Sequence, residues 1–215
     1  MSPDPHPDLS TAGAPASAPA GARPVPARRV GAVLTIGHST RPLEEFIRIL
    51  RSHGVARLVD VRAVQRSRRN PQFDAATLPA ALARTGIAHA SMPGLGGLRQ
   101  PRPDSINRAW RNASLRGYAD HMQTPEFEAE LGRLVELAEG ARIAIMCAEA
   151  VPWRCHRSLI ADALLARGVP VAHILGGARA EPHRLTPFAR IAGTRVTYPA
   201  SDVFTAGGEG GSESP

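Results

Sequence analysis

Apolar runs alternate with helical patterns from about residue 30 to about residue 200, and this alternation constrains the fold most. Short apolar runs predict buried strands, and apolar residues three or four apart predict helices. Strands that alternate with helices form mostly parallel sheets, because each helix carries the chain back across the sheet. We expect an α/β fold with a mostly parallel sheet of about five strands and helices on both faces. Strands are predicted at 30–36, 57–61, 87–92, 142–146 and 169–175, and helices at 43–53, 78–84, 115–122, 125–139 and 156–166.

Two of the predicted helices begin with a recognisable start signal. Thr124, Pro125 and Glu126 combine a capping hydroxyl, a proline suited to the first turn and a carboxylate that favours the helix N-terminus. Thr77 is expected to cap the shorter helix, with Pro79 in its first turn. Both threonines are therefore predicted to accept a backbone N–H.

The two ends of the chain have a composition that cannot form a core. Residues 1–29 are rich in Pro and Ala and residues 201–215 in Gly and Ser, so both are expected to be disordered tails. Residues 30–200 are expected to form a single α/β domain. The N-terminus does not resemble a secretory signal, and no apolar run approaches the ~20 residues that span a bilayer. We expect no membrane partner and a cytoplasmic location.

The charged residues favour an anionic partner. The formal net charge is +7, and all 26 cationic residues are arginine. Guanidinium groups bind phosphates in a bidentate manner, although a genome rich in arginine codons gives the same composition. A basic loop after the second strand contains Arg66, Arg68 and Arg69, and Phe73 could stack on a base. The alternative is a solvated loop with Phe73 packed as its anchor.

Polar side chains follow three of the predicted strands, in the segments 37–40, 60–62 and 147–149. Parallel sheets bind ligands beyond the carboxyl ends of their strands. We therefore expect these segments to meet in one cleft that also contains Arg62. The candidate catalytic residues are Cys147, His38, Glu149 and Asp60.

Cys147 lies between a buried strand and a polar loop that leads to a helix start. It is either a small buried hydrophobe or a reactive thiolate whose pKa is lowered by nearby cations. Six residues separate Cys147 from Arg154, one more than in cysteine phosphatases, which argues against that class. The candidate anion-binding residues are Arg62, Arg68, Arg69, Arg154, His156 and Arg157.

Metal binding and redox chemistry are further alternatives for this loop. Cys147, Glu149, Cys155 and His156 could ligate a metal, but the gap between the cysteines exceeds that of usual structural zinc sites. A disulfide between the two cysteines is conceivable, although a cytosolic setting would keep them reduced. The sequence assigns no metal and no cofactor.

A series of short motifs occurs in an order typical of one family. The motifs are Thr35-Ile36-Gly37-His38-Ser39, Asp60-Val61-Arg62, the segment 67–73, Leu95-Gly96-Gly97, the segment 118–122, Cys147-Ala148-Glu149, Cys155-His156-Arg157, His173-Ile174 and the segment 183–186. Over about residues 33–199 the chain resembles the domain of unknown function 488 family. The resemblance implies an α/β fold and supplies no reaction. Gln65 stands where the family usually has proline, and His89 where it usually has an aromatic residue.

Three functional hypotheses remain open. The first is an enzyme or binding protein for an anionic small molecule, with Cys147 as nucleophile or redox thiol and His38 or Glu149 as proton carrier. The second is a nucleic-acid-binding protein that uses the basic loop and whose affinity falls steeply with salt. A loose DNA-repair label attached to some members of the family points the same way. The third is a structural cluster, in which an Asp60–Arg157 ion pair ties two loops together.

Overall fold

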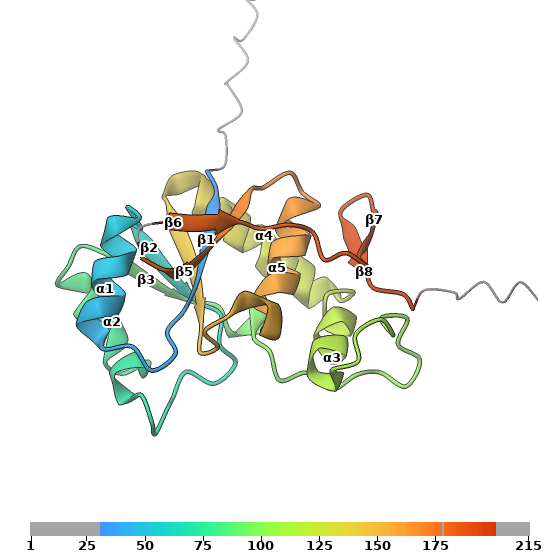
Figure 1. Cartoon of the computed structure of the whole chain (residues 1–215), viewed down its shortest axis with the longest axis horizontal. Helices are drawn as coiled ribbons and strands as arrows, with labels where there is room; N and C mark the ends of the chain where they lie inside the picture. The colour runs from blue at the N-terminus through green and yellow to red at the C-terminus, as the bar shows by residue number, and fades with distance from the viewer. Residues whose placement is uncertain (1–30, 178, 201–215) are drawn as a thin grey trace, which may run out of the picture.

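The structure is a computed structural model that describes residues 31–177 and 179–200. The tails predicted at 1–29 and 201–215 lie outside the described residues. The described chain forms one six-stranded sheet with flanking helices, followed by a small hairpin (Figure 1).

The sheet has the strand order β3-β2-β4-β1-β5-β6. The first five strands in sequence pair in parallel, and β6 pairs antiparallel with β5. The prediction of a mostly parallel α/β sheet is confirmed, with six strands instead of about five. The strands are β1 (Val33–Gly37), β2 (Arg57–Asp60), β3 (Ala88–Ser91), β4 (Ile143–Cys147), β5 (Val171–Gly176) and β6 (Arg179–Pro182), and the hairpin consists of β7 (Arg190–Ala192) and β8 (Arg195–Thr197).

The five α-helices begin and end within two residues of their predicted positions. Thr124 caps α4 as predicted, because its hydroxyl accepts the N–H of Phe127 at 3.3 Å. The predicted cap at Thr77 is wrong: its backbone is already helical, and its hydroxyl donates back to the carbonyl of Pro71 at 3.0 Å. No helix within the described ranges is long and apolar enough to cross a membrane. The helices are α1 (Leu43–Ser52), α2 (Leu78–Ala83), α3 (Ala113–His121), α4 (Pro125–Gly140) and α5 (Arg157–Leu165), with 3-10 turns η1 (Pro71–Phe73), η2 (Pro93–Leu95) and η3 (Pro152–Arg154).

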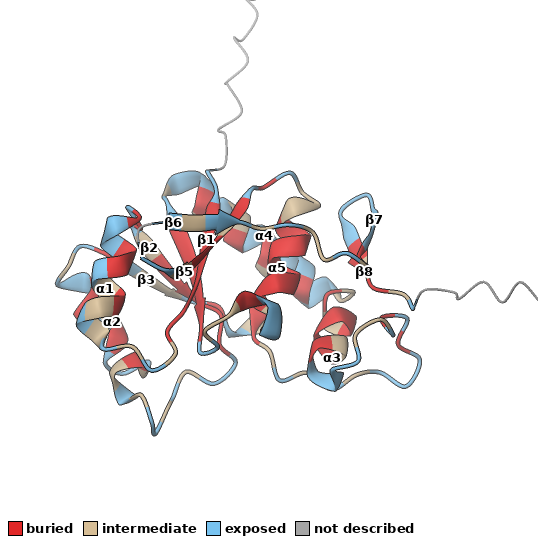
Figure 2. Cartoon of the chain, viewed as in Figure 1, coloured by how far each residue is buried: buried red, intermediate tan, exposed pale blue. Residues whose placement is uncertain are grey.

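Alternate residues of the central strands contribute to two separate hydrophobic clusters. In β4, Ile145 packs in the cluster that contains residues of α3, α4 and α5, whereas Met146 packs in the cluster that contains residues of α1 and α2. Successive side chains of a strand point to opposite faces of the sheet, so the two clusters lie on opposite faces. Figure 2 shows the central strands buried and the outer faces of the helices exposed.

The strand order brings the carboxyl ends of β2, β4 and β1 side by side. Gly37 pairs with Cys147, and Asp60 pairs with Met146. At Gly37 the chain after β4 passes so close that an added Cβ would lie 1.8 Å from the carbonyl oxygen of Glu149. Glycine therefore allows the loop after β4 to fold over the end of β1.

Candidate functional site

A cleft of about 320 Å³ lies beyond these strand ends. Cys147 enters it from the end of β4, and Arg62 from the residues after β2. Four further segments complete the lining: the loop after β4, the loop after η2, the start of α3, and the segment from Arg154 of η3 to the start of α5. The lining residues are Arg62, Ala63, Val64, Gly97, Leu98, Asn112, Ser114, Leu115, Cys147, Ala148, Glu149, Arg154, Cys155 and His156.

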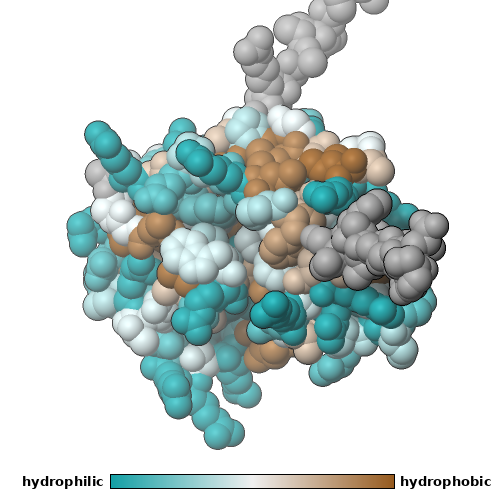
Figure 3. Space-filling view, turned by 45° about the vertical axis from the view of Figure 1, so that its right-hand side comes forward, coloured by the Kyte–Doolittle hydropathy of each residue, from teal (hydrophilic) through white to brown (hydrophobic). Residues whose placement is uncertain are grey.

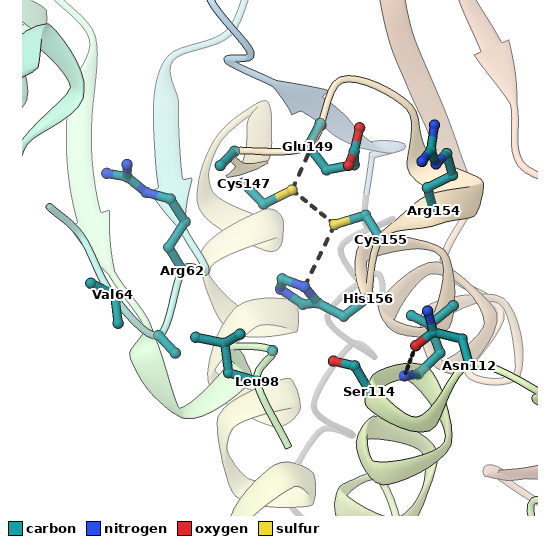
Figure 4. A pocket seen from close by; sticks show the side chains of 14 residues that line it. Arg62, Val64, Leu98, Asn112, Ser114, Cys147, Glu149, Arg154, Cys155 and His156 are labelled. Carbon is teal, nitrogen blue, oxygen red and sulfur yellow. Dashed lines mark hydrogen bonds between the residues drawn. The ribbon is translucent and has the colours of Figure 1, made fainter. Parts of the chain in front are cut away.

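The two cysteines of the chain meet at the base of this cleft. Their Sγ atoms are 2.8 Å apart, and both are free thiols. Cys147 is 3% exposed and Cys155 is 5% exposed, so the packing leaves little room for either side chain to swing away. Figure 4 shows the sulfur pair facing the cleft, with His156 on the other side of Cys155. The sequence placed only Cys147 in the candidate site, and the structure adds Cys155.

The surroundings of the two thiols are unequal. His156 Nδ1 lies 3.5 Å from Cys155 Sγ, and its Nε2 lies 3.3 Å from the carbonyl of Val61. The other neighbour of Cys147 Sγ is the carbonyl oxygen of Glu149, at 3.8 Å, which can accept a thiol proton but cannot stabilise a thiolate. Cys155 also lies two residues before the first residue of α5, near a helix N-terminus, where the helix dipole favours negative charge.

These contacts shift the two thiol pKa values in opposite directions. The hydrogen bond from Cys147 lowers the pKa of Cys155, burial opposes this, and the His156 ring lowers it further. Burial raises the pKa of Cys147, and the bond to Cys155 raises it further. Deprotonation of the pair is therefore directed to Cys155, with the Cys147 S–H donating to it.

His38, Asp60 and Arg62 form a buried group behind one wall of the cleft. The Arg62 guanidinium donates to both carboxylate oxygens of Asp60, with the shortest contact at 2.6 Å, and to the carbonyl of Phe73. His38 Nδ1 donates to the carbonyl of Ser39 at 2.8 Å, which leaves Nε2 to accept from Arg62 at 3.3 Å. Burial lowers the pKa of His38 to about 4.

This group determines which atoms of Arg62 reach the cleft. Arg62 lines the cleft with its aliphatic stem, and Figure 4 shows its guanidinium turned away from the sulfur pair. His38 and Asp60 do not contribute to the lining. His38 and Asp60 therefore hold the Arg62 guanidinium out of the cleft.

Arg157 lies beneath the loop after β4 and is 1% exposed. Its Nη2 donates to the carbonyl oxygens of Glu149 and Ala150 at 2.6 and 3.4 Å, and its Nη1 to Thr35 Oγ1 at 3.4 Å. The alternative of an Asp60–Arg157 ion pair is wrong, because Asp60 is paired with Arg62. Arg157 instead donates to the backbone of the loop after β4, which follows Cys147.

Glu149 and Arg154 are the exposed charged residues of the cleft. Glu149 Oε1 accepts the N–H of Ala150 at 3.0 Å. Arg154 belongs to η3, directly before Cys155, and Figure 4 shows it on the same side of the cleft as Glu149 and opposite Arg62. Among the arginines proposed for an anion, Arg154 is the one whose charged group is exposed at the cleft.

Arg68 and Arg69 lie on an exposed loop outside the cleft lining. Phe73 at the end of that loop is fully buried and stacks on His38, with ring centroids 4.3 Å apart. The anchor interpretation of Phe73 is therefore correct, and the ring is not available to stack on a base.

Several cleft residues come from loops that sequence periodicity does not identify. Val64 and Leu98 are 59% and 75% exposed, and Leu98 has a left-handed φ of 62°. Such a backbone is uncommon for a bulky residue and marks a conformation imposed by the surrounding loop. Figure 3 shows that apolar patches interrupt the hydrophilic surface on one face of the molecule. The only sequence signal for the loop that contains Leu98 was Gly96-Gly97.

Metal binding has little support from the arrangement of side chains. Within residues 31–177 and 179–200, no group of three or more His, Cys, Asp or Glu side chains is arranged to hold a metal ion. The two thiols and His156 Nδ1 do lie together, but Glu149 is engaged with its own loop. The site is best described as a thiol pair with a neighbouring imidazole.

Comparison with known proteins gives one match. The family model described as domain of unknown function DUF488 matches residues 42–164, which include the segments 60–62 and 147–157 that build the cleft. Neither the curated proteins nor the solved structures contain a significant match to the chain.

Proposed function

The chain belongs to the domain of unknown function DUF488 family, and on that premise we propose that its cleft binds a small molecule with an anionic group. The reactive group in this proposal is the Cys155 thiolate. The observation that carries the proposal is the position of Cys155 Sγ in the cleft, 2.8 Å from Cys147 Sγ and 3.5 Å from His156 Nδ1. Nucleophilic cysteines require a base or cation at such a distance, because the thiolate is the reactive species.

The proton of Cys155 passes to His156 in this mechanism. Because His156 Nε2 lies near the carbonyl of Val61, that nitrogen carries a hydrogen and Nδ1 is left to face the sulfur. Cys147 keeps its proton and donates it as a hydrogen bond to the thiolate. Glu149, exposed at the rim, is the candidate for moving a proton to or from a bound molecule.

Arg154 is the proposed contact for the anionic group. The guanidinium groups of Arg62 and Arg157 are occupied by Asp60 and by loop carbonyls, so neither is available without breaking buried hydrogen bonds. Arg154 is exposed and one residue from the nucleophile. The apolar side chains of Val64 and Leu98 face the rest of the cleft opening and suit an uncharged part of the same molecule.

Two alkylating agents that differ in charge test this proposal. Iodoacetate is anionic and iodoacetamide is neutral, and both alkylate thiolates. We expect Cys155 to react at neutral pH and Arg154→Gln to lower the rate ratio of iodoacetate to iodoacetamide several-fold. Arg69→Gln, which changes the same charge outside the cleft, should leave the ratio unchanged. Equal ratios in Arg154→Gln and the unsubstituted protein would contradict the proposal that Arg154 binds an anionic group. An unreactive Cys155 would contradict the proposal that Cys155 is a thiolate.

A further inference from the structure

We infer that Cys147 is the resolving thiol for Cys155 and that the cleft reduces small disulfide molecules, with the cysteine pair as electron donor. This inference rests on the proposed function, because it requires the Cys155 thiolate as the first nucleophile. It goes further by assigning a reaction and a role to the second cysteine.

The fixed proximity of the two sulfurs is the first reason. Cys147 is the last residue of β4, in register with Gly37 of β1, and Cys155 follows η3, with only His156 between it and α5. Both side chains are buried in the same hydrophobic cluster. A disulfide requires the sulfurs to approach from 2.8 Å to about 2.05 Å. The movement is less than that of a rotamer change, so a modified Cys155 remains within reach of Cys147.

The unequal environments of the thiols are the second reason. Thiol–disulfide exchange needs an attacking thiolate first and a second thiol that attacks the mixed disulfide afterwards. Cys155 has His156 Nδ1 and the start of α5 beside it, so it is the thiol that loses its proton. The hydrogen-bond partners of the Cys147 sulfur are Cys155 and a carbonyl oxygen, and neither is a base that takes up its proton, so Cys147 remains protonated until Cys155 is modified.

The reaction follows from these roles. The Cys155 thiolate attacks one sulfur of a small disulfide, the S–S bond of the molecule breaks, and its other sulfur leaves as a thiolate. Cys147 then gives its proton to that leaving thiolate and attacks Cys155 Sγ. The bond between Cys155 and the bound half breaks, and this half leaves as a second thiolate, which takes the proton held by His156. Two electrons pass from the protein sulfurs to the small molecule, which becomes two thiols, while a Cys147–Cys155 disulfide forms. A low-molecular-mass thiol is the class of reductant that restores the pair.

The dimensions and lining of the cleft limit the class of disulfide. A cleft of about 320 Å³ over thiols that are at most 5% exposed accommodates a small molecule but does not admit the disulfide of a folded protein. The exposed guanidinium of Arg154 and the apolar side chains of Val64 and Leu98 favour a disulfide with a carboxylate and an apolar or aromatic part.

The anionic aromatic disulfide dithiobis(nitrobenzoate) is a suitable probe, because each exchange step releases a coloured thiol. The native protein should release two equivalents and end as an internal disulfide with no adduct in its intact mass. Cys147→Ser should release one equivalent and retain one adduct, and Cys147→Ala provides the same test if the serine variant does not fold. Cys155→Ser should react slowly. A low-molecular-mass thiol should return the oxidised native protein to its starting mass.

The outcomes separate this inference from the proposal on which it rests. A native protein that reacts rapidly at Cys155 but retains one or two adducts shows that Cys147 does not resolve, and the inference fails while the Cys155 nucleophile stands. If Cys155→Ser reacts as fast as the native protein, the nucleophile itself has been assigned incorrectly and both fail.

Discussion

At the scale of single residues, His156 lies beside only one of the two adjacent sulfurs. Its Nδ1 is 3.5 Å from Cys155 Sγ. We expect His156→Asn to raise the pKa of Cys155, because the amide cannot take up the thiol proton. Since the pKa of Cys155 is lowered in the native protein, its alkylation rate should stay high as pH falls below neutral. In the variant the rate should fall several-fold over the same range, as measured by iodoacetamide kinetics against pH. Identical profiles would show that His156 has no part in thiol ionisation.

Gly97 supports the same contact from the opposite side. A Cβ added at Gly97 would lie 2.9 Å from His156 Nδ1, so Gly97→Ala must displace the imidazole. We expect slower alkylation of Cys155 with little change in overall fold, measured by kinetics and circular dichroism. Gly132→Ala is the matched control, because a Cβ there meets nothing within 4 Å in the middle of α4. It should leave the thiol unaffected and stabilise the helix by up to about 1 kcal/mol.

The sequence predicted which residues gather at the site better than it predicted their orientation. Parallel strands share an edge, so the placement of Cys147, Glu149 and Arg62 together followed from topology. The pairing of Arg62 with Asp60 did not follow, because two side chains two residues apart can face one another or diverge, depending on the loop between them. The role of Cys155 depends on a 2.8 Å contact across the turn at η3, which has no periodic signature.

At the scale of elements, α5 carries a buried carboxylate that fastens the C-terminal segment. Asp162 Oδ1 accepts from His183 Nε2 at 2.8 Å and from the N–H of Thr186 at 3.0 Å, and its Oδ2 accepts from the Tyr198 hydroxyl at 2.8 Å. Because a carboxylate can only accept, the hydrogen of the His183 ring lies on Nε2, which faces Asp162. His183 Nδ1 then accepts from His173 Nε2 in β5 at 2.9 Å. One side chain therefore connects α5 to β5 and to the residues after β6.

The prediction at this scale concerns Asp162→Asn. The amide has one acceptor oxygen where the carboxylate has two, so the Tyr198 O–H loses its acceptor and can only accept from the amide nitrogen. We expect the free energy of unfolding to fall by about 1–3 kcal/mol. Asp104→Asn is the matched control, because its ion pair with Arg102 is exposed and should contribute little to stability. Urea unfolding gives the free energies, and hydrogen exchange should show earlier opening of residues 183–198 in Asp162→Asn. Equal effects of the two substitutions would mean that the buried network does not fasten the segment.

The elements that the sequence did not predict were missed for one physical reason. β6 is a polar edge strand of four residues that ends in Pro182, and β7 and β8 have three residues each. Short and largely exposed strands have no apolar run or alternation, so they are defined by their partners in the fold. The predicted elements other than β3 each bury at least one side chain, whereas β3 is half-buried or exposed along its length and was predicted from the apolar residues Ile87 and Met92 on either side of it.

At the scale of the whole molecule, two histidines in different parts of the sheet make the fold sensitive to acid. Burial lowers the pKa of His38, after β1, and of His173, in β5, from the ordinary value of 6.5 to about 4. Well above pH 6.5 both rings are neutral in the folded and the unfolded chain. As pH falls from 6.5 to 4 the unfolded chain binds protons that the folded chain does not, so stability decreases across this window.

We expect each histidine to contribute on the order of 1–3 kcal/mol to this loss, discounted for partial solvent screening. Below pH 4 both rings are protonated in the folded and the unfolded chain, so they cause no further loss of stability. His38→Asn and His173→Asn should each flatten the dependence of unfolding free energy on pH between 6.5 and 4, whatever they cost at pH 7. Urea unfolding at several pH values across the window measures the slopes. If the slopes of both variants match that of the native protein, the acid sensitivity arises from other groups and the two rings titrate normally in the fold.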